Sequence, residues 1–250
     1  MSLGDVRQAS LVGLQETIAS EPDLLALSKE QAWLHVVEVA GDLARAIRTG
    51  RIDLLGEGTL LGAPLLSVLR FAELAGFNLA DATWEKFPAV CPFCVLMRND
   101  VAVLARQPGE SRARGGLGVL HPCACGAPPK PRPFDPDEPG LADFRARTDL
   151  RPTAVREWQA MFSDLYSHKH FEIQQHRDLH KLAYHFNEEI GEVAKELRKG
   201  DLRACSYEAA DVVSWILSLA NSASRTLKSD VDVAAQVAGA LDGVRRDRWG

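Results

Sequence analysis

Four acidic side chains in the C-terminal half have the types and spacing that can bind a divalent cation. Glu189 and Glu192 lie three residues apart, as do Glu208 and Asp211, so each pair projects from adjacent turns of one helix. At about 100° per residue, Glu189 falls at the edge of an apolar helix face and Glu208 falls inside one. Carboxylates facing a core are costly unless a cation neutralises them, and Mg²⁺ prefers carboxylate oxygens. The spacing therefore favours a magnesium site over acids that only solvate a helix face.

The segment that carries these acids resembles the MazG-type members of the all-α nucleotide pyrophosphohydrolase superfamily. The similarity rests on "REWQAMFSDLY", "EEIGE" and "EAADVVSWILSLAN", and it spans about residues 152 to 230. It implies a helical bundle that uses Mg²⁺, with Mn²⁺ as a substitute, to hydrolyse nucleoside triphosphates to monophosphate and pyrophosphate. It also implies that the four acids bind the metal and that Glu188 and Glu189 are catalytic, with Glu188 considered as the base that activates water.

Contacts with the nucleotide are less well defined by the sequence. Lys169, Arg177 and Lys181 lie near the ends of the first two expected helices, where they could bind phosphates or simply be solvated. Trp158 could stack on a base, although a Trp on an apolar helix face is more often part of a core. Asn221 matches the "AN" that ends the family motif and is a candidate for the nucleotide pocket.

The elements that must position the acids are helices. Apolar residues recur at steps of three and four, the spacing of one helix face, in two successive runs. The first run is Val155, Trp158, Phe162 and Leu165, and the second is Leu179, Leu182, Phe186, Ile190, Val193 and Leu197. Gly200 is suited to end the second helix in the left-handed conformation. A third helix is expected from about residue 202 and a fourth from about 230 to 244. Strand alternation is absent, so we expect an all-α bundle.

The N-terminal half repeats this outline. "VEVAGDLARAIRTG" (37–50) and "NEEIGEVAKELRKG" (187–200) share five of fourteen residues. Ser28 and Gln31 can form a capping box at the start of the earlier helix, and "NLADATWEKF" predicts another short helix. We therefore expect two tandem MazG-like helical domains, at 1–126 and 151–250, joined by a Pro-rich linker at 127–150. The proline-rich stretch, 126–140, is expected to be extended.

The first copy has lost most of the acids. Val39 replaces Glu189 and Asp42 replaces Glu192, whereas Leu61 and Pro64 align near Glu208 and Asp211. Too few carboxylates remain to hold Mg²⁺ in the manner of the family. We expect the first copy to be catalytically inactive. The protein is expected to be either a homo-oligomer or an intramolecular pseudo-dimer, in which the first copy packs against the second.

A cysteine-rich element at about 88–126 follows the first copy. It resembles an extension of some MazG-like proteins in which CxxC is followed closely by CxC. Cys91, Cys94, Cys123 and Cys125 supply four thiolates, enough for a structural zinc site, with His121 as the alternative fourth ligand. Here 28 residues separate the two cysteine pairs, and reduced cysteines without metal are the other interpretation.

Composition narrows the class of protein. The 250 residues are 46% hydrophobic and 25% charged, values of an ordinary globular protein, with a net charge of −5 that gives no general attraction to nucleic acid. No apolar run approaches the ~20 residues of a membrane span, no secretory signal is recognisable, and five cysteines suit a reducing compartment. We expect a cytoplasmic protein with no membrane partner.

The leading interpretation is a Mg²⁺-dependent nucleoside triphosphate pyrophosphohydrolase whose active site lies in the second copy. It would convert an NTP or dNTP and water to the monophosphate and pyrophosphate. Two alternatives stay open: a nucleotide sensor without turnover, and a module that binds RNA or protein through the cysteine-rich element. The intact set of four acids favours the enzyme.

Overall fold

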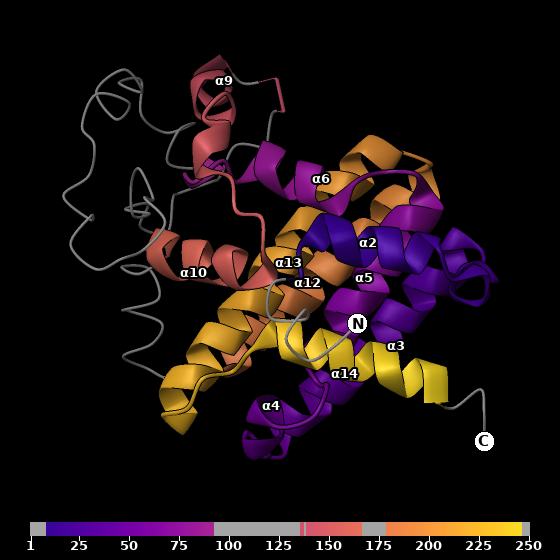
Figure 1. Cartoon of the computed structure of the whole chain (residues 1–250), viewed down its shortest axis with the longest axis vertical. Helices are drawn as coiled ribbons and strands as arrows, with labels where there is room; N and C mark the ends of the chain where they lie inside the picture. The colour runs from indigo at the N-terminus through magenta and orange to yellow at the C-terminus, as the bar shows by residue number, and fades with distance from the viewer. Residues whose placement is uncertain (1–8, 93–135, 138, 167–178, 247–250) are drawn as a thin grey trace.

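The computed structural model describes residues 9–92, 136–137, 139–166 and 179–246 (Figure 1). Every regular element within these ranges is a helix, so the expected all-α class is confirmed. In chain order the helices are α2 (Leu11–Ala19), η1 (Pro22–Leu25), α3 (Lys29–Arg48), α4 (Asp53–Gly56), α5 (Gly62–Ala75), α6 (Leu79–Lys86), α9 (Pro139–Arg145), η3 (Thr148–Leu150), α10 (Val155–Leu165), α12 (Leu179–Lys199), α13 (Leu202–Leu227) and α14 (Val233–Arg246).

The long helices begin and end where local chemistry predicts. The Ser28 hydroxyl accepts from the Gln31 N–H and the Gln31 side chain accepts from the Ser28 N–H, which is the predicted capping box. Gly200 follows α12 with φ 78°, a conformation that costs glycine little. By contrast, α13 extends beyond Asn221, to Leu227. Its run of small and apolar residues continues the buried face through Ala223.

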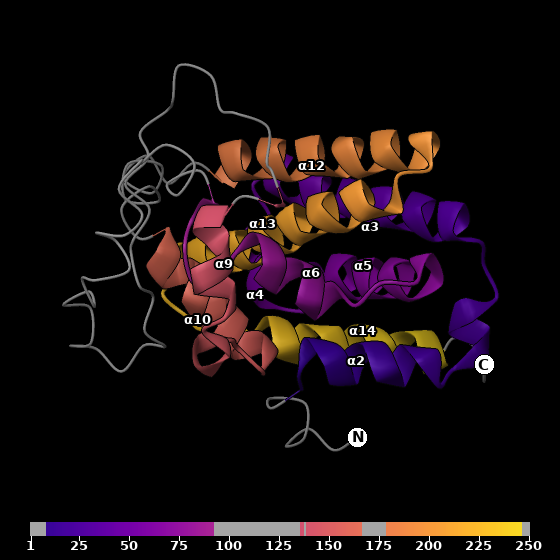
Figure 2. The same ribbon diagram turned by 90° about the horizontal axis from the view of Figure 1, so that it is seen from above.

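The helices of both halves share one hydrophobic core. Helix α3 packs against α5, and α12 packs against α13. The last helix of each half, however, lies on the central helix of the other half, since α6 packs against α13 and α14 packs against α5. Figure 2 shows α12 and α3 along one side, α13 and α5 in the middle, and α14 and α2 along the opposite side. The boundary between two domains stays a prediction, and the two halves are packed together.

Two buried glutamines make matching hydrogen bonds in the two halves. The Gln15 amide on α2 donates to the Phe77 carbonyl, just before α6, over 2.8 Å. The Gln159 amide on α10 donates to the Val231 carbonyl, just before α14, over 2.9 Å. The starts of α2 and α10 also meet in an isolated antiparallel bridge between Ser10 and Ala154. The two halves therefore use the same contact to attach their last helix.

The end of the expected linker is folded. Pro139 is the first residue of α9, a position where its missing N–H costs nothing, and Phe144 is buried. The Trp84 indole on α6 donates to the Arg145 carbonyl over 3.1 Å, and the Arg145 guanidinium donates to the Glu85 carbonyl over 2.8 Å. The linker at 127–150 stays a prediction, but at Pro139 and Gly140 the expected extended chain is wrong, because these residues begin α9.

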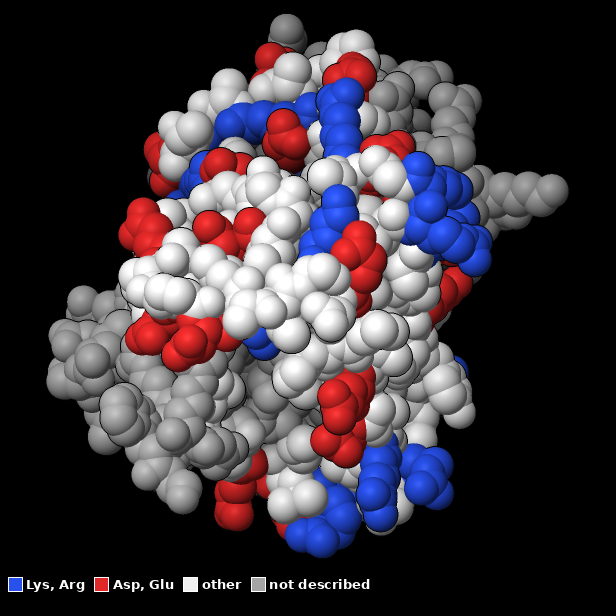
Figure 3. Space-filling model, turned by 90° about the vertical axis from the view of Figure 1, so that its right-hand side faces the viewer, with Lys and Arg blue, Asp and Glu red and all other residues white. Residues whose placement is uncertain are grey.

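Two surface properties complete the description. Over the face shown in Figure 3, acidic and basic side chains are interspersed. Among the described residues no single helix is both long and apolar enough to cross a membrane. Helices α5 and α6 reach that length and composition only as a pair, and they meet at a bend of 101°.

Candidate functional site

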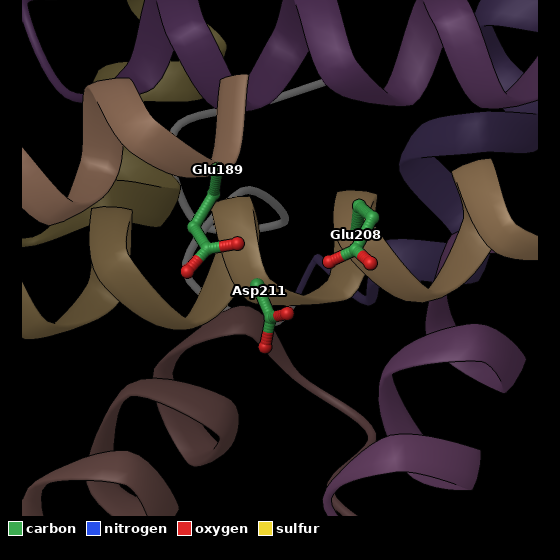
Figure 4. Close-up of side chains that lie close together, drawn as sticks. All are labelled: Glu189, Glu208 and Asp211. Atoms are coloured by element: carbon green, nitrogen blue, oxygen red, sulfur yellow. The ribbon is translucent and has the colours of Figure 1, made fainter. Parts of the chain in front are cut away.

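Three of the predicted acids lie together between α12 and α13. Glu189 comes from α12, and Glu208 and Asp211 come from successive turns of α13 (Figure 4). One carboxylate oxygen from each lies within 4.8 Å of those of the other two. Two oxygens on one Mg²⁺ at about 2.1 Å can be at most about 4.2 Å apart, so small side-chain rotations would bring all three to a single ion. The set of hard oxygen donors on two packed helices therefore fits Mg²⁺.

A lysine from the N-terminal half enters this cluster. The Lys86 side chain, at the end of α6, is only 3% exposed, and its ammonium group contacts the Asp211 carboxylate. The same nitrogen lies 3.6 Å from Glu208 Oε2 and donates to the Tyr207 carbonyl over 3.2 Å. Lys86 and Asp211 are 125 residues apart in the sequence, so it is the packing of α6 on α13 that brings them together.

Burial and mutual repulsion perturb the acids. Burial raises the pKa of Glu189 to about 8, with a further increase from the charges of Asp211 and Glu208, while Lys86 and a hydrogen bond from Trp215 oppose the shift. Burial also raises the pKa of Asp211, to about 7, and Lys86 opposes it. For Lys86, burial lowers the pKa, but the attraction of Asp211 and Glu208 outweighs it and leaves the pKa raised. The ammonium therefore stays charged at neutral pH.

The remaining acids of the motif point elsewhere. The Glu192 carboxylate accepts from the Lys195 ammonium over 2.5 Å and is 40% exposed. Glu188 is exposed and lies 3.2 Å from His185 Nδ1, and the His185 ring stacks on Trp215 with centroids 4.9 Å apart. Their roles as fourth ligand and as base stay predictions.

The other predicted site residues are divided between the core, the surface and the undescribed segments. Trp158 is completely buried and packs edge-on against Trp84, with centroids 6.4 Å apart, so it lies in the core. The buried Asn221 amide donates to the Gln159 carbonyl over 3.0 Å, while Lys181 is exposed. Lys169, Arg177, Cys94, His121, Cys123 and Cys125 fall outside the described residues, whereas Cys91 is described and buried.

The corresponding region of the N-terminal half is apolar. Leu61 and Pro64, at the start of α5, are buried, Val39 is partly buried and Asp42 is exposed. Within residues 9–92 no group of three acidic, histidine or cysteine side chains lies close enough to hold an ion. The acidic cluster belongs to the α12–α13 pair.

Sequence reasoning missed Lys86, although one signal was present. Leu79, Ala82 and Thr83 are all buried, and the step from them to Lys86 keeps to the same face of α6. A lysine on the apolar face of a helix requires an acidic partner. The sequence could have raised that question, but it could not have identified the partner.

Comparison with known families supports the assignment of the C-terminal half. The sequence profile of the MazG nucleotide pyrophosphohydrolase domain matches residues 177–240. No curated protein and no solved structure matches the chain. The matched segment contains the three clustered acids, whereas Lys86 lies outside it. The chain thus carries a MazG domain near its C-terminus, which implies nucleotide pyrophosphohydrolase activity.

Proposed function

We propose that the protein is a Mg²⁺-dependent pyrophosphohydrolase that cleaves the bond between the α- and β-phosphates of a nucleoside triphosphate. The products would be the monophosphate and pyrophosphate, from an NTP or a dNTP. The observation that carries the proposal is the convergence of Glu189, Glu208 and Asp211 within the segment that matches the MazG domain.

The chain's own side chains fit this chemistry. Glu189, Glu208 and Asp211 would hold Mg²⁺, which neutralises charge on the triphosphate and makes a bound water more acidic. Glu192 can join them by leaving Lys195, since a surface ion pair of this kind stabilises a protein by at most about 1 kcal/mol. Glu188 is next to Glu189 and exposed, so it can accept the proton of an attacking water that approaches from solvent.

The N-terminal half has a structural role in this proposal, as the degenerate first copy, which serves as an internal partner for the second. Three observations support it: the same order of helices, the matched bonds of Gln15 and Gln159, and the reciprocal packing of α6 and α14. The proposal also includes a structural zinc ion held by Cys91, Cys94, Cys123 and Cys125. It further includes association of the chain into oligomers and a cytoplasmic location.

The test is turnover with product identification. The purified full chain would be incubated with each common and modified nucleoside triphosphate and Mg²⁺, and the products would be resolved by chromatography. Monophosphate and pyrophosphate are expected, and Glu208→Gln should lower kcat by at least about a hundredfold. The matched control is Glu38→Gln, which alters the equivalent of Glu188 in the first half and should leave turnover unchanged.

Two other results would redirect the assignment. Diphosphate and phosphate as products would show cleavage of the terminal bond instead. Retention of nucleotide with no turnover would favour a sensor, for which the Lys86 ammonium among the acids is the supporting observation.

A further inference from the structure

We propose that the Lys86 ammonium is an internal counter-cation, which holds the acidic cluster together in the metal-free protein and competes with the divalent ion for the same carboxylates. The inference rests on the metal site of the proposed function. It goes beyond it because Lys86 comes from the N-terminal half, outside the segment that matches the MazG domain.

The position of Lys86 is built by the fold. Adjacent residues at the end of α6 both bind Tyr207 on α13, since the Tyr207 hydroxyl donates to the Glu85 carboxylate over 2.8 Å and Lys86 donates to the Tyr207 carbonyl. Arg145, following α9, holds the same turn through its bond to the Glu85 carbonyl. The lysine is thus aimed at the acids by three elements, which distinguishes it from a surface cation that pairs by chance.

Charge explains what the lysine does without metal. Three carboxylates that share a site repel one another, and their burial increases the cost of their charges. The Lys86 ammonium lies against Asp211 and 3.6 Å from Glu208, so it offsets part of that repulsion. A buried ammonium is itself costly unless paired. In the metal-free protein the Lys86 ammonium and the carboxylates of Asp211 and Glu208 therefore stabilise one another.

The same geometry predicts competition. The ammonium contacts Asp211 Oδ2 and lies 3.6 Å from Glu208 Oε2, so a divalent ion bound by the same two carboxylates would lie close to it and repel it. Binding of the ion therefore requires Lys86 to withdraw from these carboxylates. Part of the binding free energy of the metal is used to displace a residue of the N-terminal half, so the two halves are coupled at this site.

The experiment compares Lys86→Met with the unchanged full chain, since Met has a similar length and no charge. Two quantities are measured: the Kd for Mn²⁺ without nucleotide, by the electron paramagnetic resonance signal of the free ion, and the Tm in EDTA and in Mg²⁺. We expect Lys86→Met to bind Mn²⁺ about tenfold more tightly and to have a lower Tm in EDTA. Its Tm should also rise more on addition of Mg²⁺ than that of the unchanged protein. An equal or weaker affinity for Mn²⁺ would overturn the proposal.

Two further variants make the result specific. Lys199→Met removes an exposed lysine that pairs with Glu196 on the same helix as Glu189, away from the cluster, and it should leave the Kd for Mn²⁺ unchanged. If Lys86→Met does not fold in EDTA, the double variant Lys86→Met/Asp211→Asn restores charge balance and should recover a large part of the lost Tm; failure to do so would contradict an electrostatic role. Neither measurement requires turnover, so failure of this inference and failure of the proposed enzymatic activity can be told apart.

Discussion

The α3–α5 pair and the α12–α13 pair are packed in the same way, but the first is apolar where the second carries a cluster of carboxylates. Each is a long helix packed on a central helix, and each carries the last helix of the other half. The second pair carries three converging carboxylates, whereas the first has Leu61 and Pro64 buried in the corresponding region. The difference teaches that this scaffold does not depend on its acids: the first pair is well packed without them, and the second carries them at an electrostatic cost.

The largest effect is expected when an acid is placed in the first half, at the position that aligns near Glu208. Leu61 is fully buried at the start of α5. Leu61→Glu would place a carboxylate within the hydrophobic core, so the free energy of unfolding should fall by about 3–5 kcal/mol. Urea unfolding measures it, with Leu61→Met as the control, which should cost less than about 1.5 kcal/mol. An unaffected Leu61→Glu would mean that the first half could still accept acids.

Substitution of Gln15 and Gln159 tests whether their matching hydrogen bonds contribute equally to the free energy of unfolding. Gln159→Leu leaves the Val231 carbonyl without its donor, and we expect a loss of about 1–3 kcal/mol in the free energy of unfolding. Gln15→Leu should cost more, because the Gln15 side chain also donates to Glu73 and accepts from the Leu79 N–H. Denaturant unfolding of the two variants side by side gives the order, and a larger loss for Gln159→Leu would contradict the importance of the additional hydrogen bonds of Gln15.

Of the two helix pairs, only the second should lose stability as the pH rises, because it alone carries acids with raised pKa values. The raised pKa values of Glu189 and Asp211 mean that the folded, metal-free protein keeps protons that the unfolded chain releases near pH 4. Stability in EDTA should therefore fall as the pH rises from about 4.5 to about 8, by at least about 1.4 kcal/mol, the equivalent of one pKa unit. Thermal unfolding across this range measures the slope. Glu189→Gln should flatten it, whereas Glu38→Gln should not; the opposite pattern would place the perturbed group elsewhere.

The smallest expected effect comes from two equivalent glycines. Gly41 on α3 and Gly191 on α12 both lie within helices, and a Cβ at either would meet nothing within 4 Å. Alanine at each should raise the free energy of unfolding by about 0.5–1 kcal/mol, since glycine loses more conformational entropy in a helix. Chemical denaturation of both single variants checks this. A destabilised Gly41→Ala or Gly191→Ala would reveal a close neighbour on that face, such as a second copy of the chain.

Sequence reasoning succeeded where the controlling interactions are local. The start of α3 follows from the capping box at Ser28, and the end of α12 follows from Gly200. The pairing of Glu208 with Asp211 follows from helical spacing alone. These features depend on residues at most a few positions apart in the sequence, so they can be predicted from local motifs and helical spacing.

It failed where the contact is set by tertiary packing. Lys86 and Asp211 meet only because α6 lies on the central helix of the opposite half, and no local pattern encodes that exchange. The orientation of Glu192 toward Lys195 depends likewise on side-chain rotation, which spacing does not define. The helical end of the linker was hidden by its prolines, although Pro139 is compatible with the first turn of a helix.

The reciprocal packing of α6 and α14 has an evolutionary consequence. Each half leaves an apolar surface on its central helix that only the other half covers, so neither could be deleted, duplicated alone or recombined with a foreign partner without exposing that surface. Selection on mutations in the N-terminal half, which lacks the acidic cluster, should therefore depend on how well they preserve the shared hydrophobic core. A gene split within residues 93–135 would need both fragments expressed together, and the fragments would be inherited as a unit.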